Sequence, residues 1–311
     1  MNLVEGVLAG ERLAIARLIT QVENDTPEGR DALNRLFPHT GKAHLIGVTG
    51  SPGTGKSSLV NQIAHAYRNP IGGAQPCKVA VVAVDPSSPF TGGALLGDRV
   101  RMRDLAGDPG VFVRSMASRG TLGGLSRSTA AVVQVLDAAG YEKILIETVG
   151  AGQSEVDIAR LAHTTLVVEA PGLGDDIQAI KAGILEIADI LVVNKADRPG
   201  VENTERALRS MLELAHPERM QLGSCGRGGR SNKPKTATLP PLDEQIWIPP
   251  VLRTVATQGS GLTELMAAID RHVAYLHETG LWQERERERL QTELNQLVQA
   301  ILVAHWREGV S

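Results

Sequence analysis

The chain has 311 residues, of which 42 % are hydrophobic and 22 % are charged, a composition typical of a globular protein and unlike that of a disordered or fibrous chain. It carries 32 Lys and Arg against 35 Asp and Glu, and a net charge of -3 excludes a strongly basic surface for nucleic acid or anionic membrane as its overall character. Its two cysteines, Cys77 and Cys225, lie far apart, and no stretch approaches the roughly 18 apolar residues of a membrane span. We therefore expect a reduced, cytoplasmic protein with neither a disulfide framework nor a membrane or nucleic-acid partner.

The N-terminal part of the chain is predicted to be helical. Residues 1 to about 40 carry apolar side chains at the spacing of amphipathic helices. A second, short helix is predicted from Asp31 to Leu36, because Pro38 cannot continue it. Residues 1–42 are therefore expected to form a helical N-terminal extension.

From His44 to Ala256, short apolar runs alternate with longer helical stretches. The runs are rich in Val, Ile and Leu with little polar alternation, as expected for strands that helices cover on both faces. Seven such runs occur, at Leu45–Val48, Val79–Val84, Val111–Val113, Ile144–Ile146, Leu166–Val168, Ile190–Val193 and Val251–Val255. The alternation predicts an α/β, doubly wound domain with a mainly parallel sheet over residues 43–258.

A basic, glycine-rich stretch interrupts this pattern over residues 222–249. Within it, the run GSCGRGGRSNKPKT contains four basic residues and no acid. A mobile surface loop is the favoured interpretation, because Gly, Ser and Pro are typical of loops. A contact with phosphate or nucleic acid is the alternative.

Residues 259–311 return to a helical pattern and are predicted to form a C-terminal arm, a candidate for dimerisation. The run ERERER at 284–289 places opposite charges three residues apart, which is typical of a solvated helix. An apolar stripe follows at Leu290, Leu294, Leu297, Ile301 and Leu302. The stripe either packs on the chain's own core or contacts a partner helix in a homodimer.

Residues 50–57, GSPGTGKS, match the phosphate-loop pattern G-x-x-x-x-G-K-[ST] between a predicted strand and a predicted helix over Ser57–Tyr67. The glycines let successive backbone N–H groups point at a phosphate, and the helix N-terminus adds a favourable dipole. Lys56 is expected to reach the β- and γ-phosphates, and the Ser57 hydroxyl is expected to bind Mg²⁺. The predicted phosphate-binding residues are Gly50, Ser51, Pro52, Gly53, Thr54, Gly55, Lys56, Ser57 and Ser58.

An N-K-x-D motif, residues 194–197, directly follows the run Ile190–Val193, at the end of a strand where open α/β sheets bind ligands. The Asp197 carboxylate accepts hydrogen bonds and so matches the N–H groups on N1 and N2 of guanine, whereas adenine has no donor there. Lys195 is expected to lay its stem along the base, and Asn194 to bridge the base and the phosphate loop. The motif and the phosphate loop together favour GTP over ATP.

A further contact with the base is predicted at Thr254, Val255 and Ala256. These residues end the last predicted strand, from which a backbone N–H can reach the guanine carbonyl oxygen. The predicted base-binding residues are thus Asn194, Lys195, Asp197, Thr254, Val255 and Ala256.

An acidic residue follows the run Ile144–Ile146 in the sequence ETVG, residues 147–150. Nucleotide hydrolases place an acid at this point to hold Mg²⁺ through water, and this chain has Glu147 where Ras-like GTPases have Asp. Gly150 is predicted to approach the γ-phosphate with its N–H, so the candidate catalytic residues are Lys56, Glu147 and Gly150. Gln153 lies three residues after Gly150, a spacing that does not favour a Ras-type role in positioning water.

Two further acids are candidates for Mg²⁺. Asp85 ends the run Val79–Val84, and Asp98 follows the glycine-rich PSSPFTGGALLG, which suits a loop that orders when GTP is bound. Asp98 is alternatively the N-cap of a helix. The candidate metal ligands are Ser57, Asp85, Asp98 and Glu147.

Several long strings of the sequence closely resemble one protein family. These are the phosphate loop, VDPSSPFTGGALLGDRVRM, SMASRG, ETVGAGQSE, APGLGDDIQAIKAGILEIAD and VNKAD. Together they resemble the MeaB/ArgK-type P-loop GTPases, companions of adenosylcobalamin-dependent acyl-CoA mutases such as methylmalonyl-CoA mutase. The resemblance extends from LVEGVLAG to the C-terminal helix.

This resemblance implies a homodimer that hydrolyses GTP slowly, gates adenosylcobalamin loading and protects an acyl-CoA mutase, so that cobalamin is met only through the partner. It also implies Mg²⁺ contacts at Ser57, Asp85, Asp98 and Glu147. A mobile partner-sensing loop is implied over Pro171–Asp189. The basic stretch 222–249 departs from the family pattern, which leaves its role open.

Two other functions are alternatives to this one. A metal-insertion GTPase is expected to carry clustered cysteines or a histidine-rich tract, whereas the eight histidines here are scattered. An ATP-dependent transport-system kinase, as some relatives are labelled, is expected to prefer ATP, which the N-K-x-D motif disfavours. The sequence does not specify which acyl-CoA mutase is the partner.

Overall fold

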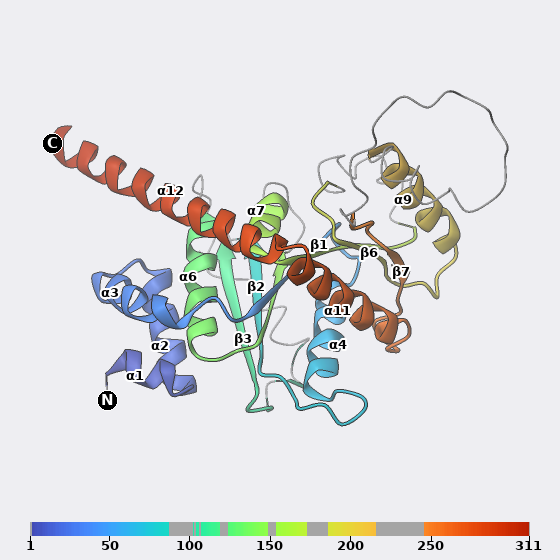
Figure 1. The fold of residues 1–311 in the computed structure, drawn as a ribbon, viewed down its shortest axis with the longest axis horizontal. Coiled ribbons are helices and arrows are strands. Elements are labelled where there is room, and N and C mark those ends of the chain that lie inside the picture. Colours follow the sequence, from blue (N-terminus) through green and yellow to red (C-terminus); the bar gives the residue numbers. More distant parts are fainter. Residues whose placement is uncertain are drawn as a thin grey trace.

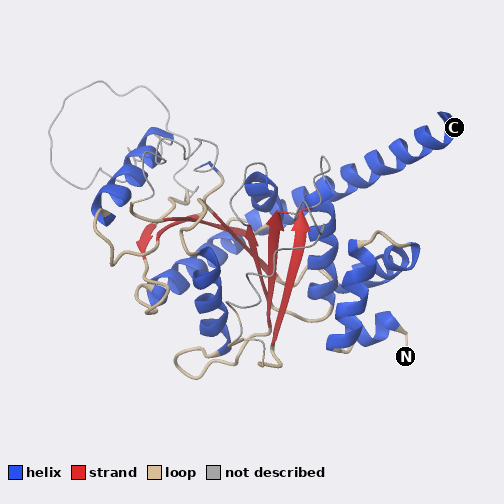
Figure 2. Ribbon diagram, turned by 180° about the vertical axis from the view of Figure 1, so that it is seen from behind, coloured by secondary structure: helices blue, strands red, loops and turns tan. Residues whose placement is uncertain are grey.

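The computed structural model describes residues 2–86, 102, 104–105, 107–118, 124–148, 154–172, 186–215 and 246–310. In this part of the chain, seven strands form one sheet in the order β3-β2-β4-β1-β5-β6-β7, and every neighbouring pair runs parallel (Figures 1 and 2). The strands are β1 (His44–Thr49), β2 (Val79–Pro86), β3 (Val111–Ser118), β4 (Lys143–Thr148), β5 (Thr164–Glu169), β6 (Ile190–Val193) and β7 (Val251–Arg253). The predicted α/β class with a doubly wound parallel sheet is confirmed.

Helices cover both faces of the sheet, because its strands present apolar side chains on either side. One face packs against α4 (Lys56–Arg68) and α11 (Leu262–Glu278). The other packs against α6 (Gly124–Ala138), α7 (Ser154–Leu161) and, towards β6 and β7, α9 (Val201–Ala215). The N-terminal helices pack beside α6 and are α1 (Leu3–Leu8), α2 (Arg12–Glu23) and α3 (Pro27–Leu36), followed by the 3₁₀ turn η1 (Phe37–His39).

All seven predicted strands are present, with differences at their ends. Strand β3 runs on to Ser118 because it pairs with β2 along its whole length. Strand β7 ends at Arg253, earlier than predicted, and beyond it Val255 forms an isolated antiparallel bridge with Ser260. Helix α3 begins before the predicted Asp31, because Thr26 caps it by accepting a hydrogen bond from the Gly29 N–H at 3.1 Å.

Helix α12 (Leu281–Val310) crosses α7 and α6 and then extends away from the rest of the molecule (Figure 1). Its distal half carries seven large apolar side chains that are 43–68 % exposed. They are Leu294, Leu297, Val298, Ile301, Leu302, Val303 and Trp306. Among the two interpretations of the apolar stripe, packing on the chain's own core therefore does not hold beyond Glu293. No helix in the described ranges is long and apolar enough to cross a membrane.

Two ionic clusters fasten the beginning of α12 to the amino-terminal edge of the sheet. In the first, Arg285 donates two hydrogen bonds to Asp189, at 2.8 and 2.9 Å, immediately before β6. Asp189 also accepts from the Thr165 N–H at 2.8 Å and faces His272 Nε2 of α11 at 3.2 Å. Burial opposes ionisation of Asp189, but Arg285 and His272 outweigh it and lower the pKa to about 2.

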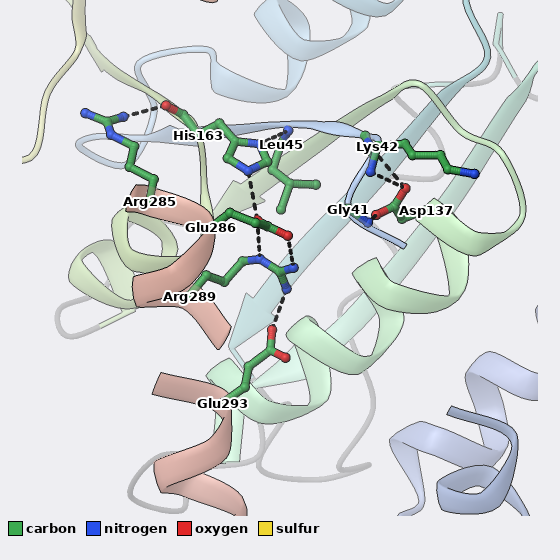
Figure 3. Close-up of polar contacts among 10 residues, drawn as sticks. Gly41, Lys42, Leu45, Asp137, His163, Arg285, Glu286, Arg289 and Glu293 are labelled. Carbon is green, nitrogen blue, oxygen red and sulfur yellow. Dashed lines mark hydrogen bonds and ion pairs between the residues drawn. The ribbon is translucent and has the colours of Figure 1, made fainter. Parts of the chain in front are cut away.

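The second cluster is centred on Glu286 (Figure 3). Its carboxylate faces His163 Nε2 at 3.1 Å and accepts two hydrogen bonds from Arg289, which also binds Glu293 at 2.6 Å. His163 Nδ1 accepts from the Leu45 N–H, which leaves the proton on Nε2 for Glu286. Burial opposes ionisation of Glu286, but His163 and Arg289 lower its pKa to about 2.

Candidate nucleotide-binding site

The phosphate loop joins β1 to α4 at the carboxyl edge of the sheet. Its glycines adopt backbone conformations that other residues rarely reach. The φ angles of Gly50, Gly53 and Gly55 are positive, at 131°, 78° and 90°. A Cβ on Gly50 would overlap the Val168 carbonyl, and one on Gly55 would lie 2.6 Å from the amide nitrogen of Asn194. The loop is thus pressed against both β5 and the N-K-x-D motif, and its shape depends on these glycines.

Lys56 lies inside the loop and is only 6 % exposed. Its ammonium donates to the carbonyls of Gly50 and Ser51, both at 2.9 Å. Thr54 Oγ1 also donates to the Ser51 carbonyl, at 3.0 Å. A lysine that donates to carbonyls at the centre of the loop can exchange them for phosphate oxygens, and phosphate binding by Lys56 stays a prediction.

Two of the four predicted metal ligands meet beside the loop. Ser57 Oγ donates to Glu147 Oε1 at 2.6 Å, and Glu147 is 1 % exposed on β4, next to β1. A hydroxyl and a carboxylate are oxygen donors of the kind that Mg²⁺ prefers, and Mg²⁺ commonly takes only one or two protein ligands with water and phosphate. This pair therefore fits the ion. In the described ranges no group of three or more His, Cys, Asp and Glu side chains is placed to hold a metal.

Asp85 lies at the same edge of the sheet. It is the next-to-last residue of β2, and Ala83, two residues earlier, pairs with Glu147. Its backbone thus ends one strand over from Glu147, as the strand order requires. The other predicted members of this region, Asp98 and Gly150, lie outside the described residues, as do residues 173–185 and 222–245 of the two predicted loops.

The N-K-x-D motif contacts the phosphate loop directly. Asn194 Nδ2 donates to the Thr54 carbonyl at 2.8 Å, and Lys195 Nζ donates to the Gly53 carbonyl at 2.5 Å. Lys195 has a φ of 56°, an unusual conformation for a residue with a side chain, which turns the chain sharply after β6. The predicted bridge from Asn194 to the phosphate loop is present.

Asn194 also joins this motif to the end of β7. Its Oδ1 accepts from Thr254 Oγ1 and from the Ala256 N–H, both at 3.1 Å. The Thr254 N–H donates to Val193 and the Val255 N–H donates to Ser260. The three N–H groups predicted to offer a base contact therefore all have partners within the protein, and the partner of the Ala256 N–H is Asn194 of the motif itself.

Asp197 is exposed on the turn that the motif forms. The Arg198 N–H closes this turn onto the Lys195 carbonyl at 3.0 Å, and the Ala196 N–H donates to Thr254 at 3.0 Å. The Asp197 carboxylate is thus carried on a hydrogen-bonded turn with its side chain accessible, as a residue that reads the edge of a base requires.

One residue of the site was not predicted. Glu169, the last residue of β5, is 6 % exposed and accepts a hydrogen bond from Ser51 Oγ at 3.0 Å. The sequence held a signal for it, because Glu169 directly follows the predicted strand Leu166–Val168, just as Glu147 directly follows the predicted strand Ile144–Ile146. A carboxylate directly after a buried strand beside the phosphate-loop strand was open to that inference.

The phosphate loop, the pair of oxygen donors and the N-K-x-D motif lie together at the carboxyl edge of one parallel sheet. This combination defines a P-loop GTPase. The family described as "Methylmalonyl Co-A mutase-associated GTPase MeaB" matches residues 15–311, and the chain belongs to this family.

Individual relatives agree with this assignment. A putative GTPase of Pyrococcus abyssi is 44 % identical over 301 residues, covering 97 % of this chain and 84 % of the relative. The protein named "Methylmalonic aciduria type A homolog, mitochondrial" of Caenorhabditis elegans is 34 % identical over 233 residues, covering 70 % of this chain and 57 % of the relative. A crystal structure titled "LAO/AO transport system kinase" superposes with a TM-score of 0.69 at 26 % identity, covering 97 % of this chain and 84 % of that one.

Proposed function

We propose that the chain is a Mg²⁺-dependent GTPase that acts as a chaperone of an adenosylcobalamin-dependent acyl-CoA mutase, gating loading of the cofactor and protecting the mutase. Membership of the MeaB family supports the partner class. The GTPase activity is supported mainly by the contact between the N-K-x-D motif and the phosphate loop. Asn194 and Lys195 donate hydrogen bonds to the carbonyls of Thr54 and Gly53. That contact couples guanine recognition to the shape of the phosphate site.

The proposed mechanism begins with an exchange of partners in the loop. When the triphosphate binds, the Lys56 ammonium leaves the carbonyls of Gly50 and Ser51 for the phosphate oxygens and stabilises the charge of the leaving diphosphate. Ser57 and Glu147 would hold Mg²⁺, with Asp85 and Asp98 as the further candidates, and the ion supplies neutralisation of phosphate charge. Gly150 would donate its N–H to the γ-phosphate.

The base is selected by hydrogen bonding at the other end of the site. Asp197 accepts from N1 and N2 of guanine, while the Lys195 stem covers the ring. Because Gln153 lies three residues after Gly150, the chain lacks the Ras-type glutamine directly after that glycine, so we expect slow turnover for the chain alone. A bound mutase then completes the site, with the segment Pro171–Asp189 as the sensing element.

The test is GTP turnover with and without the cognate mutase. We expect the rate to rise several-fold on addition of the mutase, and we expect no rise for Lys56→Ala, which lacks the phosphate-binding ammonium. An unchanged rate with a mutase that demonstrably binds would contradict the proposal. Co-purification of a cobalamin enzyme from native lysate on an immobilised GTP analogue would identify which mutase is served.

We also propose a cytoplasmic homodimer built from a helical extension (residues 1–42), a GTPase domain (43–258) and a C-terminal dimerisation arm (259–311). The exposed apolar residues of α12 support this, since a contiguous apolar face commonly marks an interface. A groove of about 780 Å³ lies between α2, α3, α6 and α12, lined by apolar residues that include Leu33, Phe37 and Leu290. The distal arm of a second copy has the apolar character to fill such a groove.

Sedimentation velocity tests the dimer. We expect Ile301→Glu to convert the dimer to a monomer, because it places a charge in the middle of the apolar face, whereas Asn295→Glu, at an exposed polar position of the same helix, leaves the dimer intact. A wild-type protein that sediments as a monomer at all concentrations, or an Ile301→Glu dimer, would contradict the proposal.

A further inference from the structure

The contact between Ser51 and Glu169 follows from the architecture of the sheet. Strands β1 and β5 pair in parallel with Ile46 opposite Thr164 and Thr49 opposite Val167. Ser51 lies two residues beyond the end of β1, after the turn at Gly50 with its φ of 131°, and Glu169 is the last residue of β5. The hydrogen bond at 3.0 Å therefore joins the start of the phosphate loop to the end of the neighbouring strand.

The backbone of this region has little freedom to change the contact. Gly50 packs against the backbone of Val168 so closely that a Cβ would overlap its carbonyl. The carbonyl of Glu169 accepts from the Asn194 N–H at 2.7 Å, which fixes the residue from the side of β6. Glu169 thus stands between the first turn of the phosphate loop and the base motif, bound to the former by its side chain and to the latter by its backbone.

Ser51 is also the residue whose carbonyl Lys56 and Thr54 both bind. The Ser51 carbonyl accepts hydrogen bonds from within the loop, and the Ser51 hydroxyl links the loop to β5. When Lys56 turns to a phosphate, one of the internal bonds to Ser51 is lost, whereas the bond to Glu169 does not involve the lysine. The Glu169 carboxylate therefore holds the first turn of the loop in place across that exchange.

We propose that Glu169 is a positioning residue for nucleotide binding, which orients the first turn of the phosphate loop by accepting the Ser51 hydroxyl hydrogen bond. It acts through Ser51 and not on the nucleotide. Without it, the loop must be ordered by the incoming nucleotide, so part of the binding free energy is lost in the ground state and the transition state alike. This inference rests on the nucleotide site proposed above.

The experiment is a double-mutant cycle on Ser51 and Glu169, read by the affinity for fluorescent GDP and for a non-hydrolysable GTP analogue, and by kcat and KM. We expect Ser51→Ala and Glu169→Ala each to weaken binding by about 3- to 10-fold, with KM raised and kcat nearly unchanged, as for uniform binding. The double variant should be no weaker than the weaker single variant, because both remove one interaction.

Glu169→Gln is the conservative variant, since its amide oxygen still accepts from Ser51 Oγ. We expect it to restore affinity to within about twofold of the wild type. Glu264→Gln, at an exposed position in the first turn of α11, is the matched control and should change neither affinity nor kcat.

The outcomes separate this inference from the site itself. If Lys56→Ala abolishes binding while the Ser51 and Glu169 variants bind as the wild type does, this inference fails and the phosphate site stands. If Lys56→Ala also binds normally, the site is wrong. Additive losses, or a fall in melting temperature without a change in affinity, would show a purely structural role for Glu169 and overturn the proposal.

Discussion

The two edges of the sheet are both polar, but their polar groups are bonded in different ways. At the carboxyl edge, Lys56, Asn194 and Lys195 donate to backbone carbonyls of the phosphate loop. At the amino edge, Arg285 and Arg289 form ion pairs with Asp189 and Glu286. Bonds to neutral carbonyls are exchanged for a charged ligand at low cost, whereas buried ion pairs are costly to break. The first edge is therefore suited to binding and the second to anchoring α12.

The largest effect on activity is expected from Lys56→Ala, at the carboxyl edge. We expect kcat/KM for GTP to fall by about 100- to 1,000-fold, because the variant removes a preorganised charge from the phosphate site. The free energy of unfolding should change little, since the lysine bonds carbonyls that water can also satisfy. Steady-state turnover together with urea unfolding checks both halves, and a strongly destabilised variant would break the contrast between the edges.

Arg285→Ala should show the reverse pattern. It leaves Asp189 buried without its ion-pair partner, so we expect the free energy of unfolding to fall by about 2–4 kcal/mol. The exposed Arg287 of the same helix gives the matched control, and Arg287→Ala should change stability by less than about 0.5 kcal/mol. Equal effects of the two substitutions in urea unfolding would show that the amino edge does not anchor the helix.

Acid should weaken the amino edge. The pKa values of Asp189 and Glu286 are lowered to about 2 in the folded protein, so their ionised forms stabilise it above the pKa of the unfolded chain. That contribution is lost as the pH falls from about 4 towards 2, and is worth roughly 2–3 kcal/mol for each group. Unfolding measured across this range should show a smaller loss in Asp189→Asn and Glu286→Gln than in the wild type, and identical slopes would refute the assignment.

The smallest effect on nucleotide binding is expected at the exposed part of the carboxyl edge. Asp197→Asn replaces an acceptor-only group that we propose binds N1 and N2 of guanine, so we expect the affinity for GTP to fall by about 10-fold or more. The affinity for xanthosine triphosphate, whose ring carries a carbonyl where guanine has an amine, should rise. Competition binding with both nucleotides is the measurement, and unchanged selectivity would remove Asp197 from base recognition.

The two edges also differ in how much of their structure could be predicted from the sequence. Lys56, Ser57, Glu147 and Asn194 lie in motifs whose chemistry requires fixed neighbours in the chain, and the structure brings them together. The seven strands were also predictable, because buried parallel strands read as continuous apolar runs.

The amino edge was not predictable in the same way. Asp189 and Arg285 are separated by 96 residues, and no motif links them. The alternating charges of ERERER predict a solvated stretch, yet Arg289 is 7 % exposed and Arg285 binds buried Asp189. Alternating charges look the same on a solvated helix as on one that is docked against an ionic edge, and the packing of the whole chain distinguishes them.

The bonds of Asn194 also have a consequence for how the chain is made. One amide side chain joins Thr54, Thr254 and Ala256, so the site draws on segments that leave the ribosome at very different times. Contacts of such long range form late in folding. We expect that a nascent chain that ends before Ala256 holds a phosphate loop but cannot yet retain a guanine nucleotide, so that nucleotide capture marks completion of the sheet.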